Sequence, residues 1–475
     1  MKLINPELPV RRAWFTELGQ RLDASPYLSG AFEARKLLER TSLPSHELHT
    51  LTAGHAGGIY NGPQFRRVYV QDPEYGVPFL GSTDIMEADF TNLPLLSKKH
   101  AYSGKLAHLE VEPGMTLISC SGTVGRMCYV RPDMAGFWSS QHVMKVQPDA
   151  HMIPSGYLHA FLLSRFGSAL ISGSAYGSII QHIEPRHLAD LPVPRLDAAT
   201  ESHIHELIQG AAELRAQAQA TLNSATRDLF DSAGLAELAD LAWHQQPRDA
   251  GFSAPASQTT LRALNFSPRA RAILDRLGSV SHRTLGDICQ GGRLSSGNRF
   301  IRIDTDAGHG YCLIGQRQAP WVRPEGRWIA LKPEELANVR VPDETSLIAA
   351  QGTLGENELY CRPIFVTGRW SRDFVFSQHF LRVISGDPEV PGAYLFALLR
   401  SEALFRVLRS LSAGSKQQDI NSVLRQRIPV PLTTPADRER IVESVRQAYR
   451  WRDEADGRED EALDLLDRTI REAAR

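Results

Sequence analysis

The chain contains an internal repeat that covers most of its 475 residues. The tripeptide Ser140–His142 returns as Ser377–His379, an offset of 377 − 140 = 237. Upstream, Gly122-Thr123 returns as Gly352-Thr353 at an offset of 352 − 122 = 230. A period this long exceeds the roughly 20–50 residues of a solenoid unit. The sequence therefore predicts two related domains in one chain. The offset of 237 also carries Tyr157 to Tyr394, Ser164 to Ser401, Gly177-Ser178 to Gly414-Ser415, Gln181 to Gln418 and Pro192–Pro194 to Pro429–Pro431.

Composition and charge are typical of a cytoplasmic protein with no membrane partner. No segment approaches the 18 or so consecutive apolar residues of a membrane span, and the five cysteines form no C-x-x-C pair. The net charge is −1, which by itself speaks against a nucleic-acid partner. Residues 262–385, however, hold 17 Lys+Arg against 12 Asp+Glu. A neutral chain with a locally basic surface can still bind DNA, because affinity depends on local neutralisation of phosphates.

The pattern along the chain predicts an α/β (α+β) fold in which each mixed domain precedes a long helix. Short β-like runs such as Met115–Cys120 and Val143–Val146 alternate with helical stretches such as Tyr157–Ile171. We expect a helical extension over 1–25, a first domain over 26–197, a long helix and turn over 198–245, a linker over 246–261, a second domain over 262–432 and a C-terminal long helix over 433–475.

The two long helices have apolar stripes at helical spacing. Residues 199–232 contain no proline and one glycine, which predicts a helix roughly 50 Å long at 1.5 Å per residue. The second helix, over 435–472, is expected to be interrupted at Asp456-Gly457. Two such helices can bury their stripes against each other as an antiparallel coiled coil, or each can pack on its own domain. The expected stripe of the second helix is Ile441, Val445, Ala448, Ala455, Ala462, Leu466 and Ile470.

Catalytic motifs are not found in the sequence. It has no phosphate-binding G-x-x-x-x-G-K-[ST] loop, no H-E-x-x-H zinc motif and no G-x-S-x-G nucleophile turn. Asp84, Glu87 and Asp89 form a small acidic group that could hold a metal, although a solvated loop is the simpler interpretation. Two copies of a domain without catalytic residues indicate a binding protein, with no enzymatic activity, metal or cofactor of its own.

The ordered set of repeated elements resembles the specificity subunit of type I restriction–modification systems, or of a related methylation-linked phage-defence system. The resemblance covers about residues 34–472. It rests on the order of the elements, each set of which leads into a long helix, because no single element is specific. The elements are Leu117–Arg126, Ser140–His142, Tyr157–Ser164, Gly177–Ile183 and Leu191–Pro194; second copies of four of them are Ile348–Gly355, Ser377–His379, Gly414–Ile420 and Ile428–Pro431.

The resemblance implies two target-recognition domains, each of which reads half of a split sequence in double-stranded DNA. The helix pair would hold these domains about one duplex turn, roughly 34–36 Å, or somewhat more apart. Adenine methyltransferase subunits would dock on the long helices, with S-adenosylmethionine bound to those subunits, and a motor–nuclease subunit could join. Two alternatives remain open: a DNA-binding scaffold without sequence preference, and a metal-dependent nuclease that uses the acidic group.

The residues expected to contact DNA are polar or cationic side chains in repeated loops. Amide side chains pair with adenine, and Arg or Lys pair with guanine or phosphate. Gln181 and Gln418 could equally brace their own loops, and the arginines could be solvated surface residues. His142 and His379 are expected to be core or hinge residues. The candidate contacts are Arg66, Arg67, Arg126, Ser178, Gln181, Arg369, Arg372, Ser415, Lys416, Gln417 and Gln418.

Overall fold

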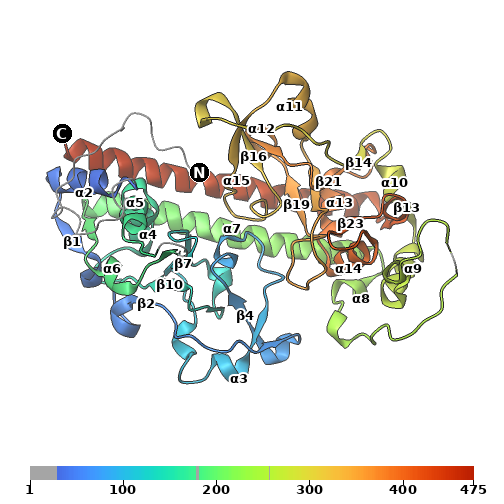
Figure 1. The fold of residues 1–475 in the computed structure, drawn as a ribbon, viewed down its shortest axis with the longest axis horizontal. Helices are drawn as coiled ribbons and strands as arrows, with labels where there is room; N and C mark the ends of the chain where they lie inside the picture. Colours follow the sequence, from blue (N-terminus) through green and yellow to red (C-terminus); the bar gives the residue numbers. More distant parts are fainter. Residues whose placement is uncertain (1–28, 178–180, 256) are drawn as a thin grey trace. The chain divides into compact units, whose positions relative to one another are not determined.

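The computed structural model describes residues 29–177, 181–255 and 257–475 (Figure 1). The helix expected over 1–25, and Ser178, lie outside these residues. The chain divides into two compact units. Unit 1 runs to Ala216 and includes Glu454–Arg475, and unit 2 comprises Gln217–Asp453.

Unit 1 contains two four-stranded sheets. The first has the strand order β2-β10-β6-β8 and is antiparallel throughout. The second has the order β3-β5-β4-β9, in which β4 and β9 are parallel. The strands are β2 (Ile59–Tyr60), β3 (Tyr69–Val70), β4 (Gly76–Leu80), β5 (Leu95–Ser97), β6 (Thr116–Ser119), β8 (Met127–Tyr129), β9 (Trp138–Ser139) and β10 (Val143–Val146).

Unit 2 repeats this topology. Its first sheet has the order β14-β21-β18-β19, and its second has the order β15-β17-β16-β20 with β16 and β20 parallel. The same two strand orders in each unit confirm the prediction of two related domains. The strands are β14 (Arg293–Ser296), β15 (Ile303–Asp304), β16 (Tyr311–Ile314), β17 (Arg327–Ala330), β18 (Thr345–Ala349), β19 (Pro363–Val366), β20 (Phe374–Phe376) and β21 (Phe380–Ile384).

Each unit also contains small two-stranded sheets. In unit 1, β1 (Ser45–Glu47) pairs with β12 (Pro192–Pro194), and β7 (Ser121–Gly122) pairs with β11 (Gln181–His182). In unit 2, β13 (His282–Thr284) with β24 (Pro429–Pro431) corresponds to the first of these pairs, and a single bridge between Gly352 and Gln418 corresponds to the second. The pair β22 (Ser412–Ala413) with β23 (Asp419–Ile420) corresponds to a bridge between Tyr176 and His182 in unit 1.

The stretch expected to be helical over Tyr157–Ile171 is helical but divided into two helices. They are α4 (Ser155–Leu163) and α5 (Arg165–Gly173), separated by Ser164 in an extended backbone conformation. The Ser164 hydroxyl accepts the backbone N–H of Gly167 and so caps α5. Ser401 caps α14 (Glu402–Ser410) after α13 (Gly392–Leu399) in the same way. The repeated serine is therefore a helix cap.

A second repeated contact explains why tyrosine and Pro-Val-Pro recur together. The hydroxyl of Tyr394 donates to the carbonyl of Pro431 at 2.9 Å, and the hydroxyl of Tyr157 donates to the carbonyl of Pro194. Both tyrosines are fully buried. Each bond anchors the strand that leads into a long helix.

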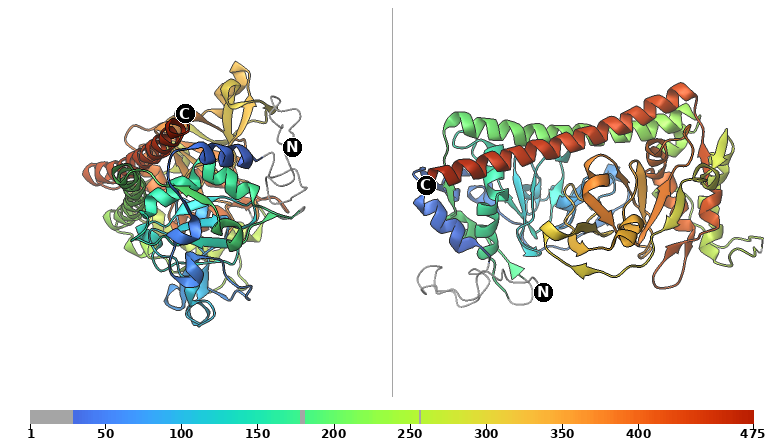
Figure 2. Two further views of the ribbon diagram at one scale, coloured as in Figure 1. Left: turned by 90° about the vertical axis from the view of Figure 1, so that its left-hand side faces the viewer. Right: turned by 90° about the horizontal axis from the view of Figure 1, so that it is seen from above.

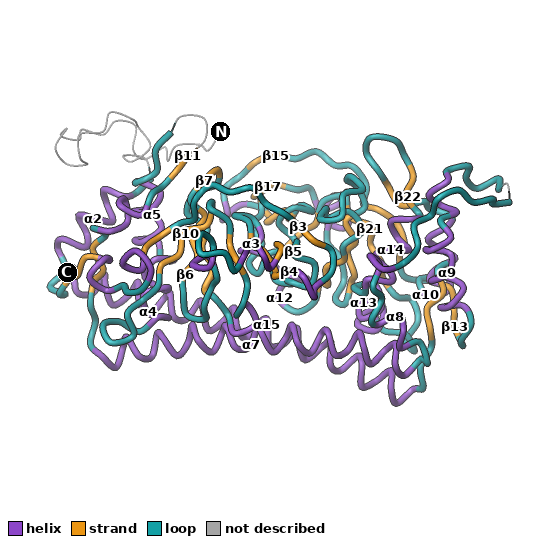
Figure 3. Tube along the Cα trace, turned by 90° about the horizontal axis from the view of Figure 1, so that it is seen from below, coloured by secondary structure: helices purple, strands orange, loops and turns teal. Residues whose placement is uncertain are grey.

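The long helices are α7 (Ala198–Ser232) and α15 (Pro435–Ala473), and they pair with each other within each unit (Figure 2). Unit 1 holds the first part of α7 with the last part of α15, whereas unit 2 holds the second part of α7 with the first part of α15. The pairing is therefore antiparallel in each unit. In Figure 3, the strands of each unit, taken by itself, lie to one side of its part of the helix pair. Every residue of the expected α15 stripe is buried.

The expected interruption of the second helix is wrong, because α15 runs through Asp456 and Gly457 without a break. A helical glycine costs only about 1 kcal/mol relative to alanine, and tertiary packing outweighs that cost. Asp456 also accepts a hydrogen bond from Arg215 of α7, at 2.8 Å. Among the helices of the described residues, none combines the length and apolar character needed to cross a membrane.

Candidate nucleic-acid interface

In unit 1, the repeated Ser-Gln-His tripeptide holds an exposed arginine. Gln141 and His142 directly precede β10 in the centre of the first sheet. Nη2 of Arg67 donates to Oε1 of Gln141 at 3.3 Å. Nε2 of Gln141 lies 3.1 Å from Nε2 of His142. We call Arg67, Gln141 and His142 the Arg–Gln–His group of unit 1.

Unit 2 has the same group at the equivalent place. Nη2 of Arg302 donates to Oε1 of Gln378 at 2.7 Å, and Nε2 of Gln378 lies 3.2 Å from Nε2 of His379. Arg302 directly precedes the edge strand β15, and Arg67 lies two residues before the corresponding edge strand β3. Arg302, Gln378 and His379 form the Arg–Gln–His group of unit 2.

The hydrogen bonds fix the protonation of both histidine rings. An amide nitrogen can only donate, so Nε2 of each histidine accepts and the ring proton is on Nδ1. In unit 2 this Nδ1–H donates to Oε1 of Gln351. Burial, and then the charges of Arg67 and His182, lower the pKa of His142. Burial, and then the charges of Arg302 and Arg299, lower the pKa of His379. Both imidazoles are therefore neutral at physiological pH.

The two arginines are exposed cations, and the charge of Arg67 acts on the carboxyl of Asp84 to lower its pKa, against the larger effect of burial. In the described parts of the chain, neither Arg67 nor Arg302 forms an ion pair. Each guanidinium lies over an aromatic ring, Arg67 at 5.4 Å from the centre of Phe79 and Arg302 at 5.5 Å from that of Phe300. A guanidinium that is held by one amide and one ring, with its remaining N–H groups open to solvent, can bind a guanine edge or a phosphate.

In unit 2, the Gly352-Thr353 turn and the loop Gly414–Gln418 meet the Arg–Gln–His group. Gln351 lies directly before the turn, and its Oε1 accepts both from His379 and from Nε2 of Gln417, the latter at 3.2 Å. The backbone N–H of Gln418 donates to the carbonyl of Gly352 at 2.9 Å. Three repeated segments that are distant in sequence therefore form one polar surface.

The same segments converge in unit 1. Strand β11 pairs with β7, which places Gln181 opposite Gly122 and His182 opposite Ser121. The charge of His182 contributes to the lowered pKa of His142. The backbone of Cys120 also donates to the carbonyl of His142 at 2.9 Å, as Ala350 does to His379 at 3.1 Å in unit 2.

The expected loop contacts differ in their exposure. Gln181, Ser415, Lys416 and Gln417 are exposed. Gln418 is buried, and its amide donates to the carbonyl of Ser415, which is the bracing role left open by the sequence. Gly414 has a φ of 92°, and a Cβ there would lie 2.6 Å from the carbonyl oxygen of Gln417. The close turn of this loop therefore requires glycine.

The remaining expected arginines have different surroundings. Arg66 is exposed beside Arg67. Arg126 is partly buried, and its backbone N–H donates to the hydroxyl of Ser119 at the end of the Gly-Thr turn.

Arg369 and Arg372 lie on α12 (Arg369–Asp373), which packs beside the C-terminal long helix within unit 2. The backbone N–H of Arg369 donates to Asp453 of α15 at 3.0 Å, and its Nε lies 3.6 Å from Asp373. Arg372 is exposed. The contacts predicted from the sequence did not include Arg302, Gln141 or Gln378. His142 and His379 were predicted to be core or hinge residues, and both side chains are half-buried. The repeat of Ser-Gln-His in the sequence could have pointed to the glutamines and histidines of both groups, but not to Arg302.

The acidic group of the nuclease alternative does not bring three ligands together, because Asp84, Glu87 and Asp89 are not among the described residues whose ligand atoms lie within 4.8 Å of one another. Burial, and then the charges of Asp84 and Asp89, raise the pKa of Glu87 to about 8, so this side chain is mostly protonated at neutral pH. Oδ2 of Asp84 accepts the backbone N–H of Gly81 at 2.7 Å, and Oδ1 of Asp89 accepts that of Thr91 at 2.9 Å.

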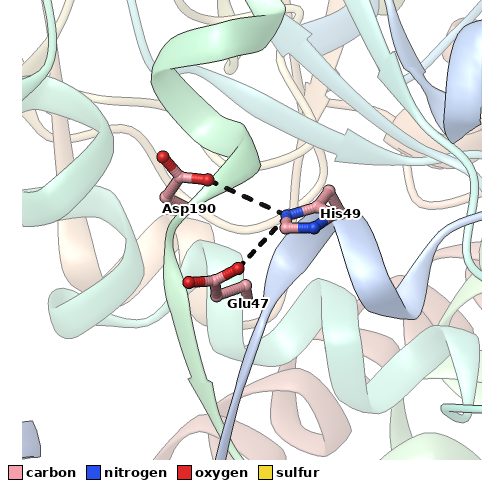
Figure 4. Close-up of side chains that lie close together, drawn as sticks. All are labelled: Glu47, His49 and Asp190. Carbon is pink, nitrogen blue, oxygen red and sulfur yellow. Dashed lines mark ion pairs between the residues drawn. The ribbon is translucent and has the colours of Figure 1, made fainter.

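A different group has metal-ligand spacing among the described residues. Glu47, His49 and Asp190 have ligand atoms within 4.8 Å of one another (Figure 4). Nδ1 of His49 lies 3.6 Å from Glu47 and 3.8 Å from Asp190. The same atom is 3.1 Å from the carbonyl of Ala189, which can only accept, so Nδ1 carries a proton and has no free lone pair. All three side chains are exposed, as in an ordinary surface ion cluster.

The sequence matches no family model and no curated protein at a significant level. Among solved structures, a type I restriction–modification S subunit from M. genitalium has a TM-score of 0.36 and 12% identity, over 91% of this chain and 96% of that chain. An HsdS subunit from Thermoanaerobacter tengcongensis has a TM-score of 0.28 and 10% identity, over 90% and 96%. A chain from a structure of type I R-M complex assembly has a TM-score of 0.26 and 12% identity, over 91% and 99%. A likeness this distant carries no weight for function, which must be argued from the chain's own residues.

Proposed function

We propose that the chain is a non-catalytic DNA-specificity subunit, which reads a bipartite sequence through its two units and directs partner adenine methyltransferase subunits to it. One observation carries the proposal: the same Arg–Gln–His group occurs once in each of two homologous units. A chain that binds one long duplex at two separate sites requires two equivalent sets of DNA contacts. The two Arg–Gln–His groups would supply one set in each unit.

The chemistry of the group suits the reading of base edges. Arginine donates two parallel hydrogen bonds to O6 and N7 of guanine, and a glutamine amide pairs in the same way with adenine. The amide of Gln141 or Gln378 holds its arginine before DNA arrives, so less side-chain entropy is lost on binding. Further phosphate or base contacts around the group would come from Arg66, Arg126, Gln181, Lys416 and Gln417. The other candidate contacts are Arg369, Arg372 and Ser415.

The long helices are proposed to dock the partners. Methyltransferase subunits would bind along α7 and α15, S-adenosylmethionine would be bound by those subunits, and a motor–nuclease subunit could join the complex. The chain would act on DNA in the cytoplasm and use no cofactor of its own. The alternative of a metal-dependent nuclease is disfavoured because Asp84, Glu87 and Asp89 are not among the described residues whose ligand atoms cluster within 4.8 Å. A scaffold without sequence preference would bind DNA but would not need two matched groups.

The test is selection from a randomised duplex library by the full chain, purified with the proteins encoded beside its gene. We expect a split motif in which Arg67→Ala removes the information in one half and Arg302→Ala removes that in the other. Arg35→Ala and Arg271→Ala are matched controls, because both arginines are exposed and lie outside the groups, on α2 (Ala31–Arg40) and α9 (Pro268–Gly278). Each group variant should weaken its half-site by about 1–3 kcal/mol.

Two results would contradict the proposal. If the affinity for DNA falls as the salt concentration rises but the selection enriches no motif, the scaffold would be favoured, because phosphate contacts alone do not distinguish base sequences. Loss of DNA integrity that requires a divalent metal would favour the nuclease. In cells, deletion of the gene should abolish adenine methylation at one split motif, as measured by modification-sensitive sequencing.

A further inference from the structure

A segment of unit 1 that follows β5 carries an excess of positive charge. It begins with the short helix α3 (Lys98–Ala101) and contains Lys98, Lys99 and Lys105 but no carboxylate. All three lysines are exposed, and in the described part of the chain none of them forms an ion pair. Lys98 donates to the backbone carbonyl of Glu74 at 2.8 Å. Lys99 and Lys105 are therefore the two cations of the segment that are open to a ligand.

The segment covers the sheet face on which Arg67 lies. The Arg67 guanidinium lies over Phe79 of β4, whose register partner on β9 is Trp138. The ring of Tyr102, which follows α3, meets Trp138 edge-on with the ring centres 4.9 Å apart. Nε1 of Trp138 also donates to the carbonyl of Leu106 at 3.0 Å. Register partners have side chains on the same face and lie about 4.8 Å apart, so Arg67 and Tyr102 lie over adjacent side chains of one sheet face.

Tyr102 connects the lysines to this face. Its backbone N–H donates to the carbonyl of Lys98 at 3.0 Å, so the helical turn extends to Tyr102. Lys99 and Tyr102 are three residues apart on this turn, which makes their side chains neighbours. Tyr102 is 60% exposed although its ring packs on Trp138. We call Lys99, Tyr102 and Lys105 the cationic surface of unit 1, and ammonium and phenol groups of this kind are common donors to DNA phosphates.

Unit 2 lacks this charge at the equivalent place. The helix there is α11 (Pro333–Val339), which follows β17, the counterpart of β5 in the strand order. Val339 of α11 lies in one buried cluster with Leu313 of β16 and Val375 of β20, so α11 covers the same face of its own sheet. Glu334-Glu335 occupies its first turn. Residues 332–340 hold two Lys+Arg against two Asp+Glu, whereas 98–105 hold three against none, so only the segment of unit 1 attracts phosphate.

We infer, on the basis of the proposed function, that the cationic surface of unit 1 binds phosphates of the duplex whose bases Arg67 reads. Because Arg67 and Tyr102 lie on one face, a single duplex can meet the base-reading arginine and the lysines together. The lysines supply affinity without base preference, since an ammonium group neutralises a phosphate whatever the base. Unit 2 holds its half-site without this contact, so the two units divide affinity and base reading unequally.

The experiment measures how the affinity for the selected duplex depends on salt. The full chain with its co-purified partners first selects a motif, and Arg67→Ala identifies the half-site of unit 1. Each phosphate contact contributes about 0.9 to the slope of log affinity against log salt concentration. The variant K99Q/K105Q should therefore reduce the slope by about 2 and keep the selected motif. Its loss of affinity should shrink about tenfold as salt is raised from roughly 50 to 200 mM.

Two control variants separate a local contact from a general effect of charge. The variant R35Q/K36Q removes two exposed cations from α2 of the same unit, outside the cationic surface, and should keep the wild-type slope. The variant K99R/K105R keeps both charges and should also keep the slope.

A second measurement maps the contact on the DNA. Neutral methylphosphonate linkages, placed one at a time along the half-site of unit 1, should weaken binding by the wild-type protein. At the linkages that Lys99 and Lys105 contact, K99Q/K105Q should no longer distinguish methylphosphonate from phosphate. The wild-type part of this measurement needs no variant to fold.

The outcomes separate this inference from the proposed function. If no motif is selected, the proposed function fails. If a motif is selected but K99Q/K105Q keeps the wild-type slope, or R35Q/K36Q reduces the slope equally, only the phosphate contact is refuted. If K99Q/K105Q changes the selected bases, the surface reads sequence and the inference is overturned. If K99Q/K105Q loses a co-purified protein while the slope is unchanged, the surface binds an acidic protein and the inference is again overturned.

Discussion

The buried ion cluster of unit 1 provides a sharp test of what holds the helix pair together. Arg215 of α7 donates from Nη2 to Asp456 at 2.8 Å and from Nη1 to Glu459 at 2.5 Å, both on α15. The three side chains are only 12%, 10% and 9% exposed. Burial lowers the pKa of Arg215, but the charges of Glu459 and Asp456 outweigh it and hold the pKa above its ordinary value. The guanidinium is therefore charged at any pH at which the chain is folded.

Replacing Arg215 by methionine removes the cation and leaves two carboxylates buried together. Removing one partner of a buried ion pair costs about 3–5 kcal/mol. In a unit of this size, each kcal/mol lowers the unfolding midpoint by roughly 2–4 °C, so Arg215→Met should lower the midpoint of unit 1 by about 6–20 °C. The measurement is thermal unfolding of the full chain, with hydrogen exchange to assign the transition to unit 1.

A triple variant and a surface pair serve as controls. Replacing Arg215, Asp456 and Glu459 together by Met, Leu and Met removes all three charges, and such replacements are often neutral or stabilising. Arg440→Met breaks the contact to Asp228 in unit 2, where Arg440 is 53% exposed, and should cause no measurable loss. The reasoning is refuted if Arg215→Met loses less than about 1 kcal/mol, or if the triple variant is as unstable as the single one.

Three further predictions concern buried polar groups. Burial lowers the pKa of Lys145 from its ordinary 10.5 to about 7. Because the unfolded chain holds more protons at this group between these values, Lys145 contributes stability to unit 1 that rises from pH 7 to pH 10 by a few kcal/mol. The raised pKa values of the buried Cys120 and Cys128 thiols act in the opposite direction, so the measurement is the difference in thermal unfolding between wild type and Lys145→Met, which should grow over this pH range. Tyr394→Phe should cost about 1–3 kcal/mol in unit 2, because it leaves the buried carbonyl of Pro431 without a donor, and Tyr157→Phe should have the same effect in unit 1. Ser401→Ala should cost about 1 kcal/mol through loss of the α14 cap, and Ser401→Asn should restore part of it in the same unfolding assay.

Part of the candidate interface could be predicted from the sequence, because the repeat aligns residues that occupy equivalent places in the two units. The tripeptide Ser140–His142 and its copy were part of the predicted repeat, and Arg67 was among the predicted contacts. Arg302 was missed, because its segment, flanked by Ile301 and Ile303, has little resemblance to the charged segment around Arg67. Only the shared hydrogen bond to the repeated glutamine reveals that the two arginines are equivalent.

The sequence by itself determined the elements whose signal is local or periodic. The offset of 237 predicted two related domains, and every residue of the stripe predicted from the apolar spacing of α15 is buried. The tertiary structure decided what depends on contacts between distant residues. The ion pair from Arg215 and the packing of α15 carry that helix through Gly457, where local propensity predicted a break. The convergence of Gln351, His379 and Gln417 on one surface also arises only in the fold, since hydrogen bonds between distant segments leave no periodic trace in the sequence.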